Sequence, residues 1–502
     1  MENLFDVIHD HGLLAVLLIA IVYFFAEAIY NVYFHSLADV PGPFWCKVSG
    51  WSSCYQASTG YRHIWIGKIT RFTGYREIYN SKANVKKAKW YEVWRRNNED
   101  YNALNTTDPH KHMVLRKPLN SAFSEKSLRL SEPFIFKNVD RWIELMLDGK
   151  KTKDTAEWAT PKNLGGEWVD YLVFDILGDL CFGKSFETIE PKENPLRQIP
   201  HMIGEYLQFI FQIRPLITRV WLKPRGIDKL LAMVTPKPVI DFYKFLETCV
   251  EEREKQEQST EKNSTENERK DMFHYLFQAK DSETGAPAFT PSSAFFYLTR
   301  KLHVYEKLAK EIRDTFSSAD DIRSGVTLSN CQYLQACCLE AMRMSPSGPL
   351  ELLRQVLPGG VEIDGHLYPE NTLIGVPSYS LHYHQETFKD PFVFRPERWI
   401  PNDELGISAE HVAALQESFK PFSIGPGQRP GKNIALLEMY MTLGRTIHGC
   451  DVRRPIDDIS NRGSGRSEYI WGQRNKNQYQ VVDAFLALRN GPVIQFRRRA
   501  NS

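Results

Sequence analysis

The longest apolar stretch of the chain lies near its N-terminus. From Leu13 to Ala26 the sequence LLAVLLIAIVYFFA contains no polar residue, and after Glu27 the apolar pattern continues to Phe34. A helix of about 20 residues is long enough to cross a bilayer. We therefore predict a transmembrane anchor at about residues 13–34, within an N-terminal region of residues 1–36. A buried first helix of the body is the alternative interpretation.

The charges that flank this stretch indicate its orientation. Three acidic residues precede it within the first ten positions, whereas Lys47 and Arg62 follow it. Basic residues gather on the cytoplasmic side of membrane helices. The stretch also lacks the small-residue cleavage site that ends a signal peptide. We expect the body, residues 37–502, to face the cytosol.

Periodicity in the rest of the chain changes from helical to mixed at about residue 350. Before that point, apolar residues recur at three- and four-residue spacing around Val139–Leu147, Trp168–Cys181, Met202–Ile213 and Asp241–Glu254, which predicts helices. The charged residues 251–271 predict a solvated helix end and a loop. Later, short β-prone runs at 361–368, 372–376 and 492–496 surround one more helix at about 433–447. We predict a mainly α body with small β elements in one large domain.

Composition and charge exclude several classes of protein. Of 502 residues, 42% are hydrophobic and 25% are charged, and the net charge is +2. These values are ordinary for a globular protein, and the basic stripe of a nucleic-acid-binding protein is missing. The eight cysteines show no C-x-x-C spacing. They indicate reduced, mostly buried thiols rather than a disulfide framework or a zinc site.

Motifs along the chain follow one another in a fixed order. The helix-breaking Pro41–Pro43 comes directly after the predicted anchor. Glu340 and Arg343 are spaced i, i+3 in a helical stretch, so they are neighbours on one helix face. Arg398 then lies in the irregular Phe394–Trp399. Each motif alone is weak evidence, but their order is informative.

The last motif is a glycine-rich loop that leads into the predicted helix at 433–447. It begins at Phe422 and contains Gly425 and Gly431. With the earlier motifs, it resembles the cytochrome P450 family, and the resemblance runs over nearly the whole chain. The sequence of residues 171–183 most resembles that of filamentous-fungal members that oxidise secondary metabolites.

This resemblance implies a fold, a cofactor and partners. We expect a cytochrome P450-like fold, an endoplasmic reticulum membrane location, a bound haem, NADPH-cytochrome P450 reductase as electron donor and a small apolar ligand. Members of the family hydroxylate or oxidise small apolar metabolites at a haem iron held by a cysteine thiolate.

The resemblance also implies roles for individual residues. It places Glu340, Arg343 and Arg398 in a buried ion network, and Phe422, Gly425 and Gly431 in a remnant of the haem loop. It further places three cations at haem propionates, namely His112, Arg116 and Arg354. The alternative interpretation of these cations is solvated or structural charge.

The loop departs from the family pattern F-x-x-G-x-R-x-C-x-G at two positions. Gly427 stands at the arginine position and Arg429 at the cysteine position. A guanidinium has no lone pair free to ligate a metal, and an unpaired buried cation is costly. Cys450 lies beyond the following helix and offers no evident replacement. We therefore predict no metal ligand and no monooxygenase activity.

Two segments of the family are missing from the sequence. No A-G-x-[DE]-T-[TS] segment, which serves proton delivery in the family's central I helix, occurs in the chain, and residues 289–301 resemble only the end of that helix. Residues 70–75 pass directly into a helix where the family first has two strands. The aromatic-rich Tyr206–Phe211 lies at the position of the family's substrate lid, with core packing as the alternative.

Three functional hypotheses follow. The favoured one is a degenerate, membrane-anchored monooxygenase without activity. The second is a non-catalytic membrane protein whose helical shell binds a partner or an apolar ligand. The third is an active enzyme misrepresented by its gene model, which would also have to replace Arg429 by cysteine.

Overall fold

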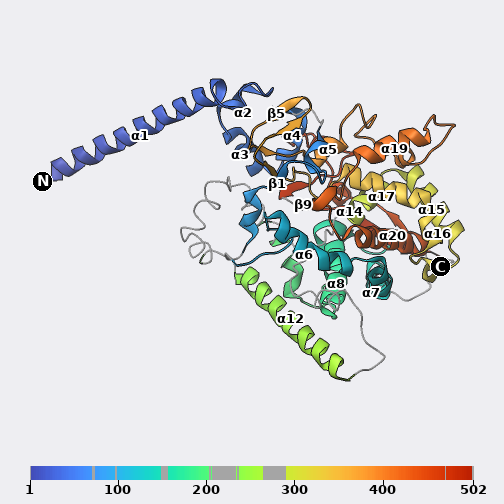
Figure 1. Cartoon of the computed structure of the whole chain (residues 1–502). Coiled ribbons are helices and arrows are strands. Elements are labelled where there is room, and N and C mark those ends of the chain that lie inside the picture. Colours follow the sequence, from blue (N-terminus) through green and yellow to red (C-terminus); the bar gives the residue numbers. More distant parts are fainter. Residues whose placement is uncertain are drawn as a thin grey trace.

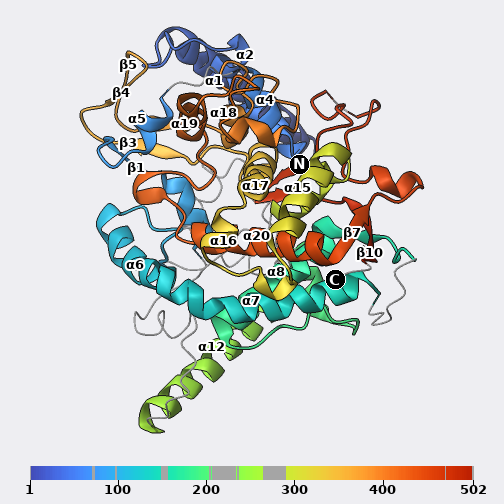
Figure 2. The same cartoon turned by 90° about the vertical axis from the view of Figure 1, so that its right-hand side faces the viewer.

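The computed structural model describes residues 2–69, 74–95, 99–148, 157–199, 237–263, 290–469, 471–484 and 486–499, together with residues 201, 202, 205 and 233. In this part of the chain, helices dominate and short strands gather at the edges of the helical body (Figures 1 and 2). The predicted class, mainly α with small β elements, is confirmed.

A long helix, α1 (Glu2–Tyr33), projects from the body (Figure 1). Its stretch Leu14–Tyr33 has a mean hydropathy of 2.0 and is not buried by the rest of the described chain. By length and composition it could cross a membrane, and it coincides with the predicted span. Pro43 lies in an extended conformation directly before the next helix, so the proline-rich element separates α1 from the body.

Short helices connect α1 to the body. They are α2 (Phe44–Val48), α3 (Trp51–Ser58), α4 (Arg62–Ile69) and α5 (Tyr75–Tyr79).

Helices and helical turns make up most of the body. They are η1 (Lys89–Trp94), α6 (Pro109–Ala122), α7 (Glu125–Met146), η2 (Leu164–Trp168), α8 (Val169–Phe182), η3 (Pro195–Gln198), α12 (Lys237–Asn263), α14 (Thr290–Leu298), α15 (Leu302–Thr315), η5 (Ala319–Asp321), α16 (Val326–Ser329), α17 (Gln332–Met344), α18 (Ser378–His382), η6 (Pro396–Trp399), α19 (Ala409–Ser418), η7 (Gly425–Gly427), α20 (Lys432–Gly449) and η8 (Asp458–Asn461).

The main hydrophobic core lies among α7, α8, α14, α15, α17 and α20. α14 packs on both α17 and α20, and its Phe295 and Phe296 are fully buried. Trp142 of α7 is also fully buried, and its ring lies 6.4 Å from that of Phe295. Burial of large aromatic side chains contributes strongly to the stability of such a core.

Helices predicted from the apolar pattern appear as α7, α8, α12, α17 and α20, which confirms those predictions. α7 begins earlier than predicted, because Ser124 caps it by accepting a hydrogen bond from the Ser127 N–H. Pro133 lies inside α7 and interrupts the pattern that would have shown its first half. Apart from residues 202 and 205, the predicted helix at 202–213 and the aromatic stretch Tyr206–Phe211 lie outside the described residues.

Strands form small antiparallel sheets. One has the order β1 (Val85–Lys87), β3 (Arg354–Val356), β6 (Leu373–Ile374), and another has the order β2 (Lys162–Asn163), β10 (Val493–Arg498), β7 (Cys450–Arg453). The remaining pairs are β4 (Val361–Ile363) with β5 (His366–Tyr368), and β8 (Val482–Ala484) with β9 (Leu486–Leu488).

Strands late in the chain were predicted, but β1 and β2 lie in the region where only helices were predicted. Each of them pairs with a late strand, β1 with β3 and β2 with β10. Short segments of this kind become strands through their partners, so the local sequence gave no signal for them.

The two segments predicted to be missing adjoin residues outside the described ranges. α14 begins at Thr290, and residues 264–289 before it are not described. Residues 70–73 before α5 are likewise not described. The loss of most of the central helix and of the first strands therefore stays a prediction.

Candidate functional site

A buried carboxylate on α17 organises one side of the site. Arg343 Nε and Nη2 each donate to the Glu340 carboxylate at 2.9 Å, and Arg398 Nε donates to it at 3.0 Å. Trp399 Nε1 adds a further hydrogen bond of 2.9 Å. Burial alone would raise the pKa of Glu340, but the arginines lower it. The structure thus brings the three predicted network residues together, with both arginines on the one Glu340 carboxylate.

The network also fixes the chain around it. Arg343 Nη1 donates to the His382 carbonyl oxygen at 2.8 Å, and the Arg395 N–H donates to Glu340 at 3.1 Å. Glu340 and Arg343 are completely buried. Removing Glu340 would leave two buried guanidinium groups without their counter-charge, which is strongly destabilising.

The glycine-rich loop turns back on itself before it enters α20. The Arg429 N–H donates to the Phe422 carbonyl oxygen at 2.9 Å. Gly425 has a φ of 64°, and a Cβ at this position would overlap the carbonyl oxygen of Tyr79. A glycine is therefore required here on both grounds. Gly431 then caps α20 and lies against the ring of Phe123.

Arg429, at the position predicted to have lost its cysteine, is partly buried. Its Nη1 donates to Ser347 Oγ at 2.9 Å. Burial lowers the pKa of the guanidinium, while Tyr91 and Tyr75 nearby oppose that shift. No ion pair joins Arg429 to a carboxylate among the residues that the structure describes. A cation with five donors and no acceptor can bind an anion here but cannot ligate a metal.

Gly427, at the other departure, leaves room for a neighbouring arginine. Arg354 Nη2 lies 2.6 Å from the point where a Cβ of residue 427 would stand. Arg354 is buried, and its Nη1 donates only weakly to the Leu352 and Leu353 carbonyl oxygens, at 3.3 and 3.1 Å. Burial raises the pKa of Tyr91, and both Arg354 and Arg429 oppose that rise. The two arginines therefore share one environment.

Arg354 belongs to a cluster of cations that sequence reasoning identified only in part. Lys87 on β1 stands directly opposite Arg354 on β3 in the sheet register. Like charges opposite each other across strands are destabilising. Burial lowers the pKa of Lys87 to about 7, with further contributions from Arg354 and Arg116. Burial, Lys87, Arg116 and Arg354 together lower the pKa of His112 to about 4. We call Lys87, Arg116, Arg354 and Arg429, together with the neutral His112 imidazole, the cation cluster.

Counter-charges are missing from this cluster in the described part of the chain. Lys87 Nζ donates to the carbonyl oxygens of Ala103 and Leu104 at 2.6 and 3.1 Å, and Arg116 Nε donates to Asn120 Oδ1 at 2.9 Å. These partners are neutral. Buried cations that lack a carboxylate are stabilised by a bound anion. No local sequence pattern indicated a role for Lys87, because only strand pairing places it beside Arg354.

The site has residues that suit the propionates of a haem group, but it lacks a residue that could ligate the iron. The cation cluster would suit the two propionate carboxylates, which accept charge-assisted hydrogen bonds. Arg429 stands where the loop pattern predicts the cysteine ligand, and its guanidinium could not take the place of a thiolate. Cys450 begins β7 opposite Arg498, and burial raises its pKa to about 12. Among the described residues, no group of three or more His, Cys, Asp and Glu side chains could hold a metal ion.

Comparison with known proteins identifies the family. The cytochrome P450 family model matches residues 68–292 and 284–465. The chain is 30% identical to the cytochrome P450 monooxygenase fscF of Fusarium equiseti, over 95% of each chain. It is 31% identical to a cytochrome P450 monooxygenase of Gibberella zeae, over 84% of this chain and 97% of that one. It is 29% identical to the cytochrome P450 monooxygenase apf7 of Gibberella fujikuroi, over 94% of this chain. On this evidence, together with the buried Glu340 network and the loop before α20, the chain belongs to the cytochrome P450 family.

Proposed function

We propose that this chain is a membrane-bound cytochrome P450 family member without haem-thiolate monooxygenase activity. The residue that carries the proposal is Arg429, which stands at the cysteine position of the loop pattern and donates a hydrogen bond to Ser347. When bound in this family, haem held by a thiolate activates oxygen. Arg429 supplies neither the sulfur ligand nor a lone pair that could replace it.

The rest of the site supports binding without that chemistry. Lys87, His112, Arg116 and Arg354 would hold carboxylates at the edge of the site. Arg429 would add a further positive charge beside them. The missing A-G-x-[DE]-T-[TS] segment and the proposed loss of most of the I helix would remove proton delivery as well. The substrate class of an active ancestor is, on this proposal, a small apolar metabolite of fungal secondary metabolism.

Location and partners are part of the same proposal. α1 would anchor residues 1–36 in the endoplasmic reticulum membrane, and residues 37–502 would form one cytosolic domain. The family works with a redox reductase, and NADPH-cytochrome P450 reductase would be the partner of an active relative. Lys47 and Arg62 after the span support this orientation.

A second candidate function is non-catalytic binding of an apolar ligand or a protein partner. The Glu340 network favours it, because Arg343 and Arg398 both remain buried in contact with the Glu340 carboxylate. A chain under no constraint to fold need not keep such an arrangement. The third hypothesis, an active enzyme misrepresented by its gene model, is tested by transcript sequencing, which would have to show a cysteine codon at position 429.

The decisive experiment is an absorbance spectrum of the full chain, expressed with added haem, then reduced and exposed to carbon monoxide. We expect no red-shifted carbonyl band of thiolate ligation. The double variant Gly427→Arg with Arg429→Cys should gain that band if the remaining shell still accepts haem. The band in the unaltered protein, or hydroxylation with reductase present, would contradict the proposal.

A further inference from the structure

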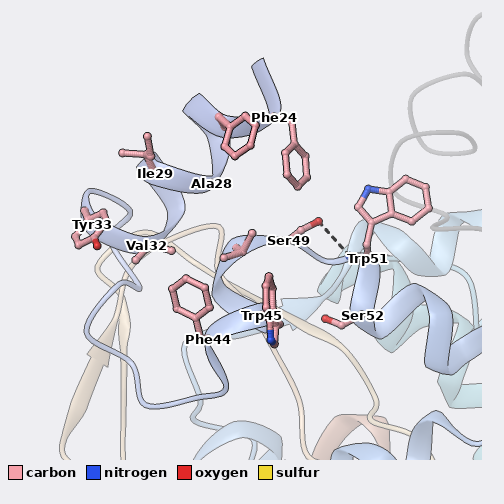
Figure 3. A pocket seen from close by; sticks show the side chains of 12 residues that line it. Phe24, Ala28, Ile29, Val32, Tyr33, Phe44, Trp45, Ser49, Trp51 and Ser52 are labelled. Carbon is pink, nitrogen blue, oxygen red and sulfur yellow. Dashed lines mark hydrogen bonds between the residues drawn. The ribbon is translucent and has the colours of Figure 1, made fainter. Parts of the chain in front are cut away.

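A groove lies where α1 meets the body. It has a volume of about 660 Å³ and is lined almost entirely by apolar groups from α1 on one side and from α2 and α3 on the other. Figure 3 shows Phe24, Ile29 and Val32 of α1 across the groove from Phe44 and Trp45 of α2. This volume lies within the range of about 300–1,000 Å³ that is usual for ligand sites.

One wall of the groove is the candidate membrane span itself. The lining residues Phe24 to Tyr33 all lie within Leu14–Tyr33. A helix rises by about 1.5 Å per residue, so these residues extend over about 13 Å of α1. If Tyr33 stands at the membrane surface, the part of the groove beside Phe24 therefore lies within the hydrocarbon region.

The opposite wall carries large aromatic side chains that the body leaves exposed. Phe44 is 57% exposed, Trp45 72% and Trp51 73%. Exposed aromatic patches of this kind mark contact surfaces. Tryptophan and tyrosine in particular are enriched at the boundary between membrane and water.

The charges around this wall suit a lipid surface. From Val40 to Arg76 the sequence contains no Asp or Glu, whereas it contains Lys47, Arg62 and Lys68. Lys47 Nζ donates to the Ala38 carbonyl oxygen at 2.6 Å, at the junction between α1 and α2. Basic residues beside an apolar face are attracted to anionic lipid headgroups.

We propose that this groove binds a phospholipid acyl chain, so that α2 and α3 lie in the membrane interface beside the anchor. The inference rests on the proposal that α1 crosses the membrane. An acyl chain between the two aromatic walls would remove their apolar surface from water, which is favourable in proportion to the area covered. The body would then be held at a defined depth and orientation by two contacts instead of one flexible tether.

Tryptophan fluorescence of the full chain in phosphatidylcholine vesicles tests the proposal. α1 contains no tryptophan, so quenching by lipids brominated along their acyl chains reports on the body and not on the anchor. We expect quenching in the unaltered protein. The double variant Trp45→Phe with Trp51→Phe keeps the apolar surface but should lose most of that quenching. Trp158→Phe is the matched control, because Trp158 lies against Arg453 and Arg497 on the C-terminal sheet, and it should leave the quenching unchanged.

Alkaline carbonate extraction distinguishes a failure of the groove proposal from a failure of the anchor proposal. Retention in the membrane with equal quenching of the unaltered protein and the double variant would overturn the groove proposal and leave the anchor intact. The same result is expected if a second copy or an apolar substrate fills the groove. Release by carbonate would overturn both the anchor and the groove, without bearing on the loss of monooxygenase activity.

Discussion

Two buried sets of charges in this protein differ in how they are satisfied. In the network around Glu340, both arginines contact the same carboxylate within the protein at 2.9–3.0 Å. In the cation cluster, Lys87 faces Arg354 across a sheet, and neither meets a carboxylate among the described residues. The first set stabilises the fold by itself. The second has only neutral partners among the described residues, so a bound anion would stabilise it.

The comparison also separates what Arg429 changed from what it left alone. Arg429 adds one more cation to a set that already lacks a counter-charge. Among the described residues, no hydrogen bond or ion pair joins Arg429 to the Glu340 network. On the proposal that the monooxygenase chemistry is lost, this network can persist without it, because the two sets share no side chain.

The largest expected effect comes from disrupting the network around Glu340. Glu340→Gln removes the charge that both arginines need and should cost about 3–5 kcal/mol of unfolding free energy, as for other broken buried ion pairs. Chemical denaturation of the full chain in detergent measures this cost. Glu362→Gln, on an exposed strand position, is the matched control and should be neutral. An equal loss in both variants would show that the network does not hold the fold.

A smaller effect is expected from pH, which acts on the protonation of Lys87 in the cation cluster. The unfolded Lys87 holds its proton up to about pH 10.5, whereas the folded one releases it near 7. Between these values the unfolded state binds more protons, so stability rises with pH across this window. Each pKa unit corresponds to about 1.4 kcal/mol, and solvent screening of the partly exposed amine reduces the total to about 1–3 kcal/mol. Thermal unfolding at pH 7 and pH 9 checks the sign.

Replacing Lys87 tests the repulsion between Lys87 and Arg354 directly. Lys87→Met deletes one of two opposed charges and should stabilise the ligand-free protein by about 1 kcal/mol, while abolishing most of the rise in stability above pH 7. Lys86→Met is the matched control, because Lys86 pairs with Gln355 on the same strands. A loss of stability in Lys87→Met would mean that the lysine's hydrogen bonds to Ala103 and Leu104 outweigh the repulsion.

The smallest effect is expected at Gly427. Gly427→Ala places a methyl group where the mobile end of Arg354 now lies, so the guanidinium can move aside at a cost of about 0.5 kcal/mol or less. Gly425→Ala, by contrast, meets the backbone of Tyr79 at a positive φ and should cost about 1–3 kcal/mol. Equal costs in urea denaturation would show that Arg354 is held in place.

Local patterns in the sequence determined a large part of this protein. Glu340 and Arg343 lie one helical turn apart, so their spacing alone places them on one face of α17. The apolar run of α1 is likewise visible without any partner. Arg429, at the predicted cysteine position of the glycine-rich loop, is visible in the sequence alone, and it carries the proposed loss of activity.

The cation cluster and the groove depend on contacts between segments that are remote in the sequence. Lys87 and Arg354 are far apart in the chain, and the pairing of β1 with β3 brings them face to face. The groove between α1 and α2 depends on the angle at which the chain turns after Pro43. In a helix, the 3.6-residue period of the sequence shows which side chains lie on the same face. Strand pairing and the packing of one helix on another depend on segments remote in sequence, and no local pattern encodes them.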